Sequence, residues 1–255
     1  MIRLTDFPLL VFAISLLWLY LAAQVGAALG RRRPIGAESA RGDFDVVRAA
    51  TLTLLGLIIG FSFSMAISRY DQRKNYEEAE ANAIGTEYVR AGLLLAADAA
   101  TVRTLLRKYL DQRVSFYTTR DTQQLRQIDA DTAKLQADLW ATLQGPAAGN
   151  PTPVMALALA GMNDVLNSQG YTQAAWWNRI PRAGWGLMVT IATCGCVLIG
   201  YGARSIVPET ILLLVLPLVV SISLFFIADL DSPRGGVIRV SPQNLVSLAE
   251  SLSAQ

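Results

Sequence analysis

Charged residues are absent from four long stretches of this chain, and each stretch has the length of a membrane-spanning helix. The stretches cover residues 7–29, 49–68, 183–203 and 210–228, and none of them contains Asp, Glu, Lys or Arg. A helix needs about 20 predominantly apolar residues to cross the hydrocarbon core of a bilayer. The pattern therefore predicts an all-α, polytopic membrane protein with four transmembrane helices.

The first stretch has a second interpretation, as a signal peptide with Arg3 at its basic end. The apolar region of a signal peptide is typically about 7–15 residues long. Here the uncharged run extends for 17 residues before Gln24 and then continues, and Trp18 and Tyr20 are bulky for that role. We therefore expect a helix that is retained.

Residues 69–182, between the second and third stretches, are polar and favour helices, and no part of them alternates as a strand does. One helical pattern continues from the second stretch to about residue 95. Asp98 and Asp121 can each cap a further helix, the first of which reaches about residue 117. The apolar residues of these two helices recur on one side, at Val102, Leu105, Leu106 and Tyr109 and at Leu125, Ile128, Leu135 and Leu139.

Glycine and proline are expected to divide the rest of this segment. Residues 145–153 predict a loop, residues 154–167 a short helix, and Gly170 a break. Trp176 and Trp177 then precede the third stretch, where they suit a membrane interface or pack within the helical segment. The expected domains are residues 1–69 (first transmembrane pair), 70–182 (helical extramembrane domain), 183–228 (second transmembrane pair) and 229–255 (C-terminal tail).

Composition supports a membrane protein and excludes several other classes. Hydrophobic residues make up 53% of the chain and charged residues 16%, and the net charge of +2 gives no basic field for nucleic acid. Histidine is absent, which removes the usual general base and a common metal ligand. Cys194 and Cys196 lie inside an apolar stretch, where a small packing residue is the simplest role. Because no catalytic, phosphate-binding or metal-ligand motif occurs, we expect no enzyme, no cofactor and no metal site.

Two adjacent stripes distinguish the second stretch. Small residues recur every four positions and would let another helix approach closely, at Gly56, Gly60, Ser64 and Ser68. Beside them, a second stripe offers side chains at one-turn intervals, at Thr53, Leu57, Phe61 and Met65. The same side continues beyond the stretch with uncharged residues, at Gln72, Asn75, Ala79 and Asn82.

Charged residues follow the second stretch as two i,i+4 pairs, Arg73 with Glu77 and Lys74 with Glu78. Such pairs support a solvated helix and are common on protein surfaces. We expect that role for them rather than an ion site.

Several short motifs resemble those of the bestrophins and, more closely, those of the bacterial bestrophin-like domain proteins. They are Gly60-Phe61, then Ser68-Arg69-Tyr70 followed by Gln72 and Tyr76, and the runs at residues 80–86 and 229–235. Bestrophins carry a Gly-Phe pair at the pore neck and a Thr-Arg-Trp run just after it. The resemblance covers most of the chain in layout, and its sequence support is concentrated in residues 57–86 and 230–240.

The resemblance implies a pentamer in a bacterial inner (cytoplasmic) membrane, with the second helix of each subunit lining a central pore. The three bulky rings of a bestrophin neck fall by position on Thr53, Leu57 and Phe61, and Thr53 departs from that apolar character. The implied pore-lining residues are Thr53, Leu57, Phe61, Ser64, Ser68 and Gln72, and the helix-packing residues are Gly56 and Gly60. The implied partners are membrane lipid, further copies of the chain and small inorganic ions.

Two aspartates follow the fourth stretch, Asp229 and Asp231. Calcium-sensitive animal bestrophins have a dense acidic cluster there, so calcium gating is not expected for this chain. Ion pairs with Arg69, Arg179 or Arg182 are the simpler interpretation of the aspartates, and a cation site is the alternative.

The orientation in the membrane stays open. Four spans put both termini and residues 70–182 on one side, which holds eight Lys or Arg near the spans against six on the other. Arg31, Arg32 and Arg33 favour a cytoplasmic position for the first loop, whereas the family resemblance favours the opposite.

Two hypotheses for the function are compatible with these observations. The first is an oligomeric ion channel with a hydrophobic neck, because apolar constrictions gate by dewetting and need no ionisable residue inside the membrane. No stretch contains the intramembrane charge that a coupled transporter usually needs. The alternative is a non-conducting membrane scaffold or regulatory subunit.

Overall fold

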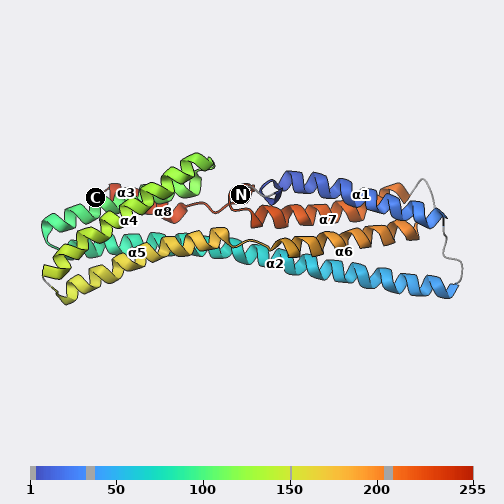
Figure 1. Ribbon diagram of the computed structural model, residues 1–255, viewed down its shortest axis with the longest axis horizontal. Helices are drawn as coiled ribbons and strands as arrows, with labels where there is room; N and C mark the ends of the chain where they lie inside the picture. Colours follow the sequence, from blue (N-terminus) through green and yellow to red (C-terminus); the bar gives the residue numbers. More distant parts are fainter. Residues whose placement is uncertain (1–3, 33–37, 150, 204–208, 255) are drawn as a thin grey trace. The chain divides into compact units, whose positions relative to one another are not determined.

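A computed structural model of the chain describes residues 4–32, 38–149, 151–203 and 209–254, and within these ranges every regular element is a helix (Figure 1). Arg3 and Arg33, named above, lie outside the described residues. The elements are η1 (Leu4–Asp6), α1 (Pro8–Arg32), α2 (Glu38–Arg90), η2 (Ala91–Leu93), α3 (Ala96–Thr118), α4 (Thr122–Gly149), α5 (Pro153–Trp177), α6 (Arg182–Gly202), α7 (Glu209–Asp231) and α8 (Gln243–Ser253).

The predicted all-α class and its four spans are confirmed. Helical segments long and apolar enough to cross a membrane occur at Pro8–Arg32, Ala40–Leu93, Pro153–Gly202 and Leu213–Asp231. Each of them overlaps one of the four uncharged stretches. The chain is therefore an integral membrane protein.

The chain divides into two compact units, each described here by itself. The spanning unit comprises Met1–Tyr70 and Arg179–Arg239, and the extramembrane unit comprises Asp71–Asn178 and Val240–Gln255. Both α2 and the expected tail, residues 229–255, contribute to the two units. The domain bounds drawn from the sequence concern membrane position, which compactness does not measure, and they stay a prediction.

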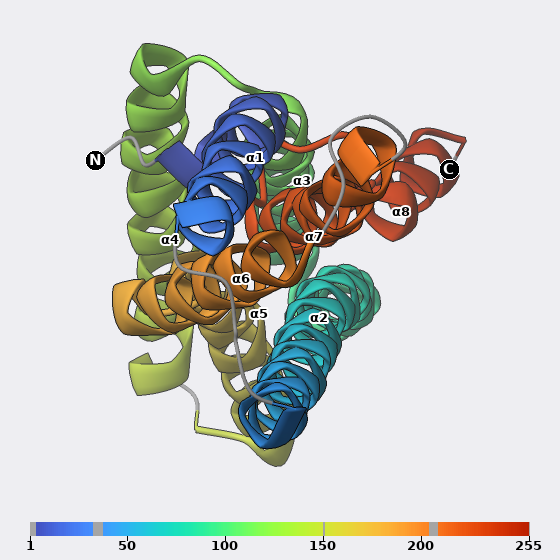
Figure 2. The same ribbon diagram turned by 90° about the vertical axis from the view of Figure 1, so that its right-hand side faces the viewer.

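Glycines bring α1 and α6 of the spanning unit into very close contact. A Cβ atom added to Gly200 would overlap the carbonyl oxygen of Ala23, and one added to Gly26 would overlap that of Val197. Small residues of this kind let spanning helices approach until their backbones touch. Figure 2, which looks along the helices, shows α1, α6 and α7 next to one another, in agreement with their contacts.

We expect Gly200→Ala to destabilise the protein by about 1–3 kcal/mol, because the added methyl group forces two packed backbones apart. Gly170 of α5 offers a matched control, since a Cβ atom there meets no atom within 4 Å. Gly170→Ala should raise helix stability by up to about 1 kcal/mol. Thermal unfolding of the purified variants measures both effects, and equal midpoints would show that the close contact is not needed.

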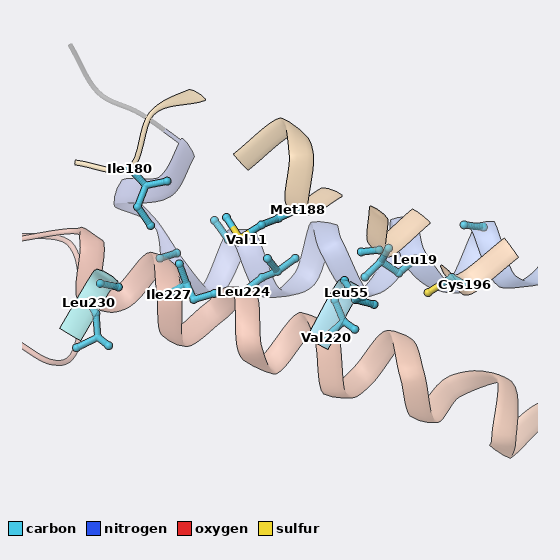
Figure 3. Close-up of a cluster of buried hydrophobic side chains, with 14 of the residues drawn as sticks. Val11, Leu19, Leu55, Ile180, Met188, Cys196, Val220, Leu224, Ile227 and Leu230 are labelled. Carbon is cyan, nitrogen blue, oxygen red and sulfur yellow. The ribbon is translucent and has the colours of Figure 1, made fainter. Parts of the chain in front are cut away.

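Apolar side chains from the spanning helices fill the interior of the spanning unit (Figure 3). Leu55 of α2, Met188 of α6 and Leu224 of α7 meet there, and each is almost completely buried. Cys196 is buried in the same cluster, as expected for a small packing residue, whereas Cys194 is exposed.

Two predicted breaks in the extramembrane unit need correction. α4 runs to Gly149 and contains Pro146, so that of the loop predicted over residues 145–153 the structure describes only residues 151 and 152 as non-helical. The break predicted at Gly170 is wrong, because Gly170 lies inside α5. Pro146 is in the last turn of α4, where a carbonyl group left without a donor is easily hydrated. A glycine inside a helix costs only about 1 kcal/mol relative to alanine, which the packing of α5 outweighs.

The two predicted helix caps have different outcomes. Asp121 caps α4 as predicted, because its carboxylate accepts a hydrogen bond from the backbone N–H of Gln123 at 2.9 Å. Asp98 does not cap α3, which begins at Ala96 with no side-chain cap. It lies in the first turn, where a negative charge still interacts favourably with the helix dipole.

The apolar sides predicted for α3 and α4 face the interior: most of their residues are buried, namely Val102, Leu106, Tyr109, Ile128 and Leu139, and the rest are half-buried, namely Leu105, Leu125 and Leu135. The paired tryptophans divide between the two interpretations. Trp176 is buried against the rings of Phe116 and Tyr117, with centroids 5.0 and 5.5 Å away. Trp177 is 72% exposed and is the one free to lie at an interface.

Candidate pore helix

α2 is a helix of 53 residues with one covered and one uncovered side. Its buried residues recur mainly at intervals of three, four or seven positions, as one face of a helix requires. In the spanning unit they are Leu55, Ser62 and Ala66, and in the extramembrane unit they include Arg73, Glu77, Glu80, Ile84 and Glu87. The other helices of the chain therefore cover only this side of α2.

The uncovered side holds all the predicted pore-lining residues, which are Thr53, Leu57, Phe61, Ser64, Ser68 and Gln72. Leu57 is 52% exposed and Phe61 is 62% exposed. The fold brings no described helix of its own chain over these side chains. Their role in a pore stays a prediction.

The two glycines expected to pack helices together, Gly56 and Gly60, lie in open space. A Cβ atom added to either would meet nothing within 4 Å. Neither glycine therefore packs against a described helix of its own chain, and their role in helix packing stays a prediction. The glycines that bring described helices of the spanning unit together include Gly26 and Gly30 of α1 and Gly200 of α6. Sequence reasoning missed them, although Gly26 and Gly30 show the same four-residue spacing.

In the extramembrane unit, Gln72, one of the predicted pore-lining residues, begins a polar and aromatic group. Its side-chain amide donates a hydrogen bond to the hydroxyl group of Tyr76 at 3.4 Å. The ring of Tyr76 stacks on that of Tyr171 of α5, with centroids 5.9 Å apart. Tyr171 was not found from the sequence, because nothing local links it to α2.

Asp231, at the end of α7, holds α2 through an ion pair, as the simpler interpretation predicts. Its carboxylate lies 3.3 Å from Arg69 of α2 and accepts a hydrogen bond from the backbone N–H of Ile180 at 2.9 Å. Arg179 pairs with Asp6 instead. Asp231 therefore joins three segments of the spanning unit that are far apart in the sequence.

Asp229 has a different role, because backbone groups satisfy its carboxylate. Its two oxygen atoms accept hydrogen bonds from the N–H groups of Val237 and Ile238, at 2.7 and 2.8 Å. This pairing shapes the turn that follows α7. The described residues contain no group of three or more acidic or thiol side chains that could hold a metal ion, so the cation-site alternative finds no support among them.

The expectation that Arg73 and Glu77 form a solvated pair is wrong, since each is 1% exposed. The helix α8, which was not predicted, covers this part of α2. Glu77 accepts a hydrogen bond from the backbone N–H of Leu245 at 3.0 Å and another from the side chain of Asn244 at 2.6 Å. It thereby caps the N-terminus of α8, whose first N–H groups have no partner within the helix.

A second buried charge, Glu80, lies at the centre of a polar network in the extramembrane unit. Glu80 forms an ion pair with Arg113 of α3, in which both side chains are completely buried. It also accepts hydrogen bonds from the hydroxyl groups of Tyr117 and Thr172, at 3.4 and 3.2 Å. Burial opposes the charge on Arg113, but the carboxylate of Glu80 outweighs it and raises the pKa of Arg113.

Glu87 is a further charged side chain of this row and is completely buried. Both of its carboxyl oxygens are buried without a hydrogen-bond partner among the described residues. The carboxyl group packs on Gly161 of α5, where a Cβ atom would overlap it. Burial raises the pKa of Glu87 to about 8, with smaller and opposing contributions from Arg90 and Asp164.

Because the pKa of Glu87 is raised in the folded protein, we expect the stability of the protein to depend on pH. The folded protein keeps the proton up to about pH 8, whereas the unfolded chain releases it near 4.5. Between these values the free energy of unfolding should fall by about 1 kcal/mol per pH unit as the pH rises. Glu87→Gln, which cannot ionise, should lose that part of the slope. Thermal unfolding at pH 6 and pH 8 compares the two proteins, and parallel shifts would contradict the assignment.

Comparison with known protein families gives one match that spans most of the chain. A family model described as Bestrophin-like domain matches residues 17–245. No curated protein matches the chain significantly.

Several solved structures share the fold. Three crystal structures of a bacterial bestrophin homolog from Klebsiella pneumoniae are similar, two of them variants with one mutation. The first is 13% identical, with a TM-score of 0.68 over 94% of this chain and 97% of that one. The second is 16% identical, with a TM-score of 0.66 over 96% and 97%. The third, solved by zinc phasing, is 15% identical, with a TM-score of 0.63 over 96% and 95%. Identities this low establish the shared fold and leave the function to be argued.

Proposed function

Because the chain belongs to the Bestrophin-like domain family, we propose that it is an ion channel formed by five copies, with α2 of each copy facing a central pore. One observation carries the proposal: α2 leaves a whole side uncovered, and that side presents Leu57 and Phe61 one turn apart. Bestrophins are ion channels and not enzymes, which agrees with the lack of any catalytic motif in the sequence.

The proposed neck lies at Leu57 and Phe61. Five copies would place two apolar rings one turn apart around the axis. A narrow apolar ring cannot replace the water that an ion must shed, so ions meet a dehydration barrier there and the pore closes by dewetting. Both side chains stand free of their own chain and can therefore project into such a lumen.

Hydroxyl and amide groups flank the proposed neck. Thr53 lies one turn before Leu57, and Ser64, Ser68 and Gln72 follow Phe61 on the same side. Such groups hydrogen-bond water and would keep the lumen wet on both sides of the apolar rings. The conducting path then has one short dry segment, which is the part that opening must change.

We place this channel in a bacterial inner membrane, with other copies of the chain, lipid and small inorganic ions as its partners. The alternative is a scaffold or regulatory subunit that uses the same side of α2 only for packing. Cryo-electron microscopy of the purified oligomer, followed by recordings in planar bilayers, separates the two. A five-fold assembly with Leu57 and Phe61 on the axis and measurable current supports the channel. A correct assembly without an axial lumen supports the scaffold.

A further inference from the structure

We infer that the spanning unit binds one membrane lipid, with an acyl chain in a groove between α1 and α6 and the lipid phosphate beside Arg182. The inference does not depend on whether the protein conducts ions.

The groove arises because α1 and α6 touch at one end and separate toward the other. The two helices run in the same direction, with Trp18 donating a hydrogen bond to Thr193 at 3.0 Å. Beyond this pair they close at Gly26 and Gly200. Before it they diverge, and a cavity of about 490 Å³ lies between them, near the first turns of both helices. Gly186 widens it, because a Cβ atom there meets nothing within 4 Å.

The lining of the groove is suited to hydrocarbon and not to water. Val11, Ile14, Trp18, Trp185 and Val189 provide most of the wall. The hydroxyl group of Ser15, which also lines the groove, already donates to the carbonyl oxygen of Phe12 at 3.1 Å. Other polar groups of the lining residues are the hydroxyl group of Thr5 and the indole N–H of Trp185, which is buried without a hydrogen-bond partner among the described residues. A buried water needs two to four polar partners, and these scattered groups suit it poorly. At membrane depth, the apolar material available to fill the space is a lipid acyl chain.

The charge at the mouth of the groove favours an anionic headgroup. Arg182 is the first residue of α6, one turn before Gly186, and it is exposed. The neighbouring cation, Arg179, is engaged by Asp6. The N-terminus of α6 adds the positive end of its dipole to the charge of Arg182, and both attract a phosphate group.

A second copy of the chain is a poorer occupant. α6 lies between α1 and α2, because Gly200 faces Ala23 of α1 while Gly195 faces Leu55 of α2. The groove is therefore on the side of α6 that faces away from α2. Other exposed residues of α1, outside the groove, are apolar, as at Leu9 and Leu17, which suits contact with lipid.

Native mass spectrometry of the purified protein, reconstituted with phosphatidylglycerol or phosphatidylcholine and then washed with detergent, tests this inference. We expect one phosphatidylglycerol retained per chain, and at least a fivefold lower retention in Gly186→Leu, which fills the groove. Ile14→Trp fills it from α1 and should behave alike if Gly186→Leu fails to fold. Leu187→Phe is the matched control, because Leu187 lies on α6 outside the groove and should retain the lipid.

Arg182→Gln should lower the retention of phosphatidylglycerol to that of phosphatidylcholine. Equal retention of both lipids by the unchanged protein would overturn the headgroup assignment. Full retention in both groove-filling variants would overturn the groove. Loss of the oligomer in those variants, with no lipid bound to the unchanged protein, would show that a second copy occupies the groove.

Discussion

Phe61→Ala should open the pore: in planar bilayers we expect a several-fold rise in conductance or open probability. The phenyl group is 62% exposed on the uncovered side of α2, so shortening it removes little packing within the chain. Five shortened side chains would widen the ring and admit a continuous water column, which lowers the dehydration barrier for ions. Leu57, one turn away, would become the remaining constriction.

Phe63→Ala is the matched control for this experiment. Phe63 is also exposed, but it lies about 200° further round the helix and should not reach the same lumen. If Phe61→Ala lowers stability and leaves conductance unchanged, Phe61 fills a gap between helices. If the unchanged protein and Phe61→Ala are both silent while correctly assembled, the scaffold replaces the channel. Opening by Phe63→Ala instead would leave a channel with a different helix register.

The spans were predictable because their signal is local. Twenty uncharged residues in a row specify a spanning helix wherever the rest of the chain lies. The same locality explains why the covered side of α3 and α4 was found from the spacing of Val102, Leu106 and Ile128. It also explains the errors at Pro146 and Gly170, where the local cost of a helix breaker is small and the packing of the whole helix decides.

The buried charges were not predictable, because their partners lie far away in the sequence. Glu77 accepts a hydrogen bond from the backbone N–H of Leu245, which is 168 residues away in the sequence. Glu80 pairs with Arg113, which is 33 residues away. From the sequence, an i,i+4 pair at Arg73 and Glu77 is indistinguishable from a surface pair. Only the structure shows that α8 packs on this side of α2 and buries the pair.

The uncovered side of α2 was predictable in part for the opposite reason, whereas its role in a pore stays a prediction. The uncovered side of α2 is the side on which no other described helix of its own chain packs. The stripes of small and bulky residues in the sequence already indicated this side. What the sequence and the single chain both lack is the neighbouring subunit. The two glycines of that side therefore provide the most direct test of whether a neighbour exists.

Gly60→Leu should disrupt the oligomer, because a branched side chain would force the backbones of neighbouring subunits apart. Within a single chain the change causes no steric clash at the Cβ position, since a Cβ atom at Gly60 meets nothing within 4 Å. Leucine is also the better helix former, by about 0.5–1 kcal/mol. Loss of assembly in a variant that remains folded would therefore report on contacts between subunits.

Cross-linking and native mass measurement give the oligomer size, and Gly60→Ala is the matched control. Alanine keeps the position small, so that variant should assemble as the unchanged protein does. An unchanged oligomer in Gly60→Leu would remove Gly56, Gly60 and Ser64 from the interface, and α2 would then have to meet its neighbours through another side. A graded response, intact with alanine and lost with leucine, fits an interface that accepts small side chains such as Ser64 and excludes large ones, because only the size of the side chain changes along that series.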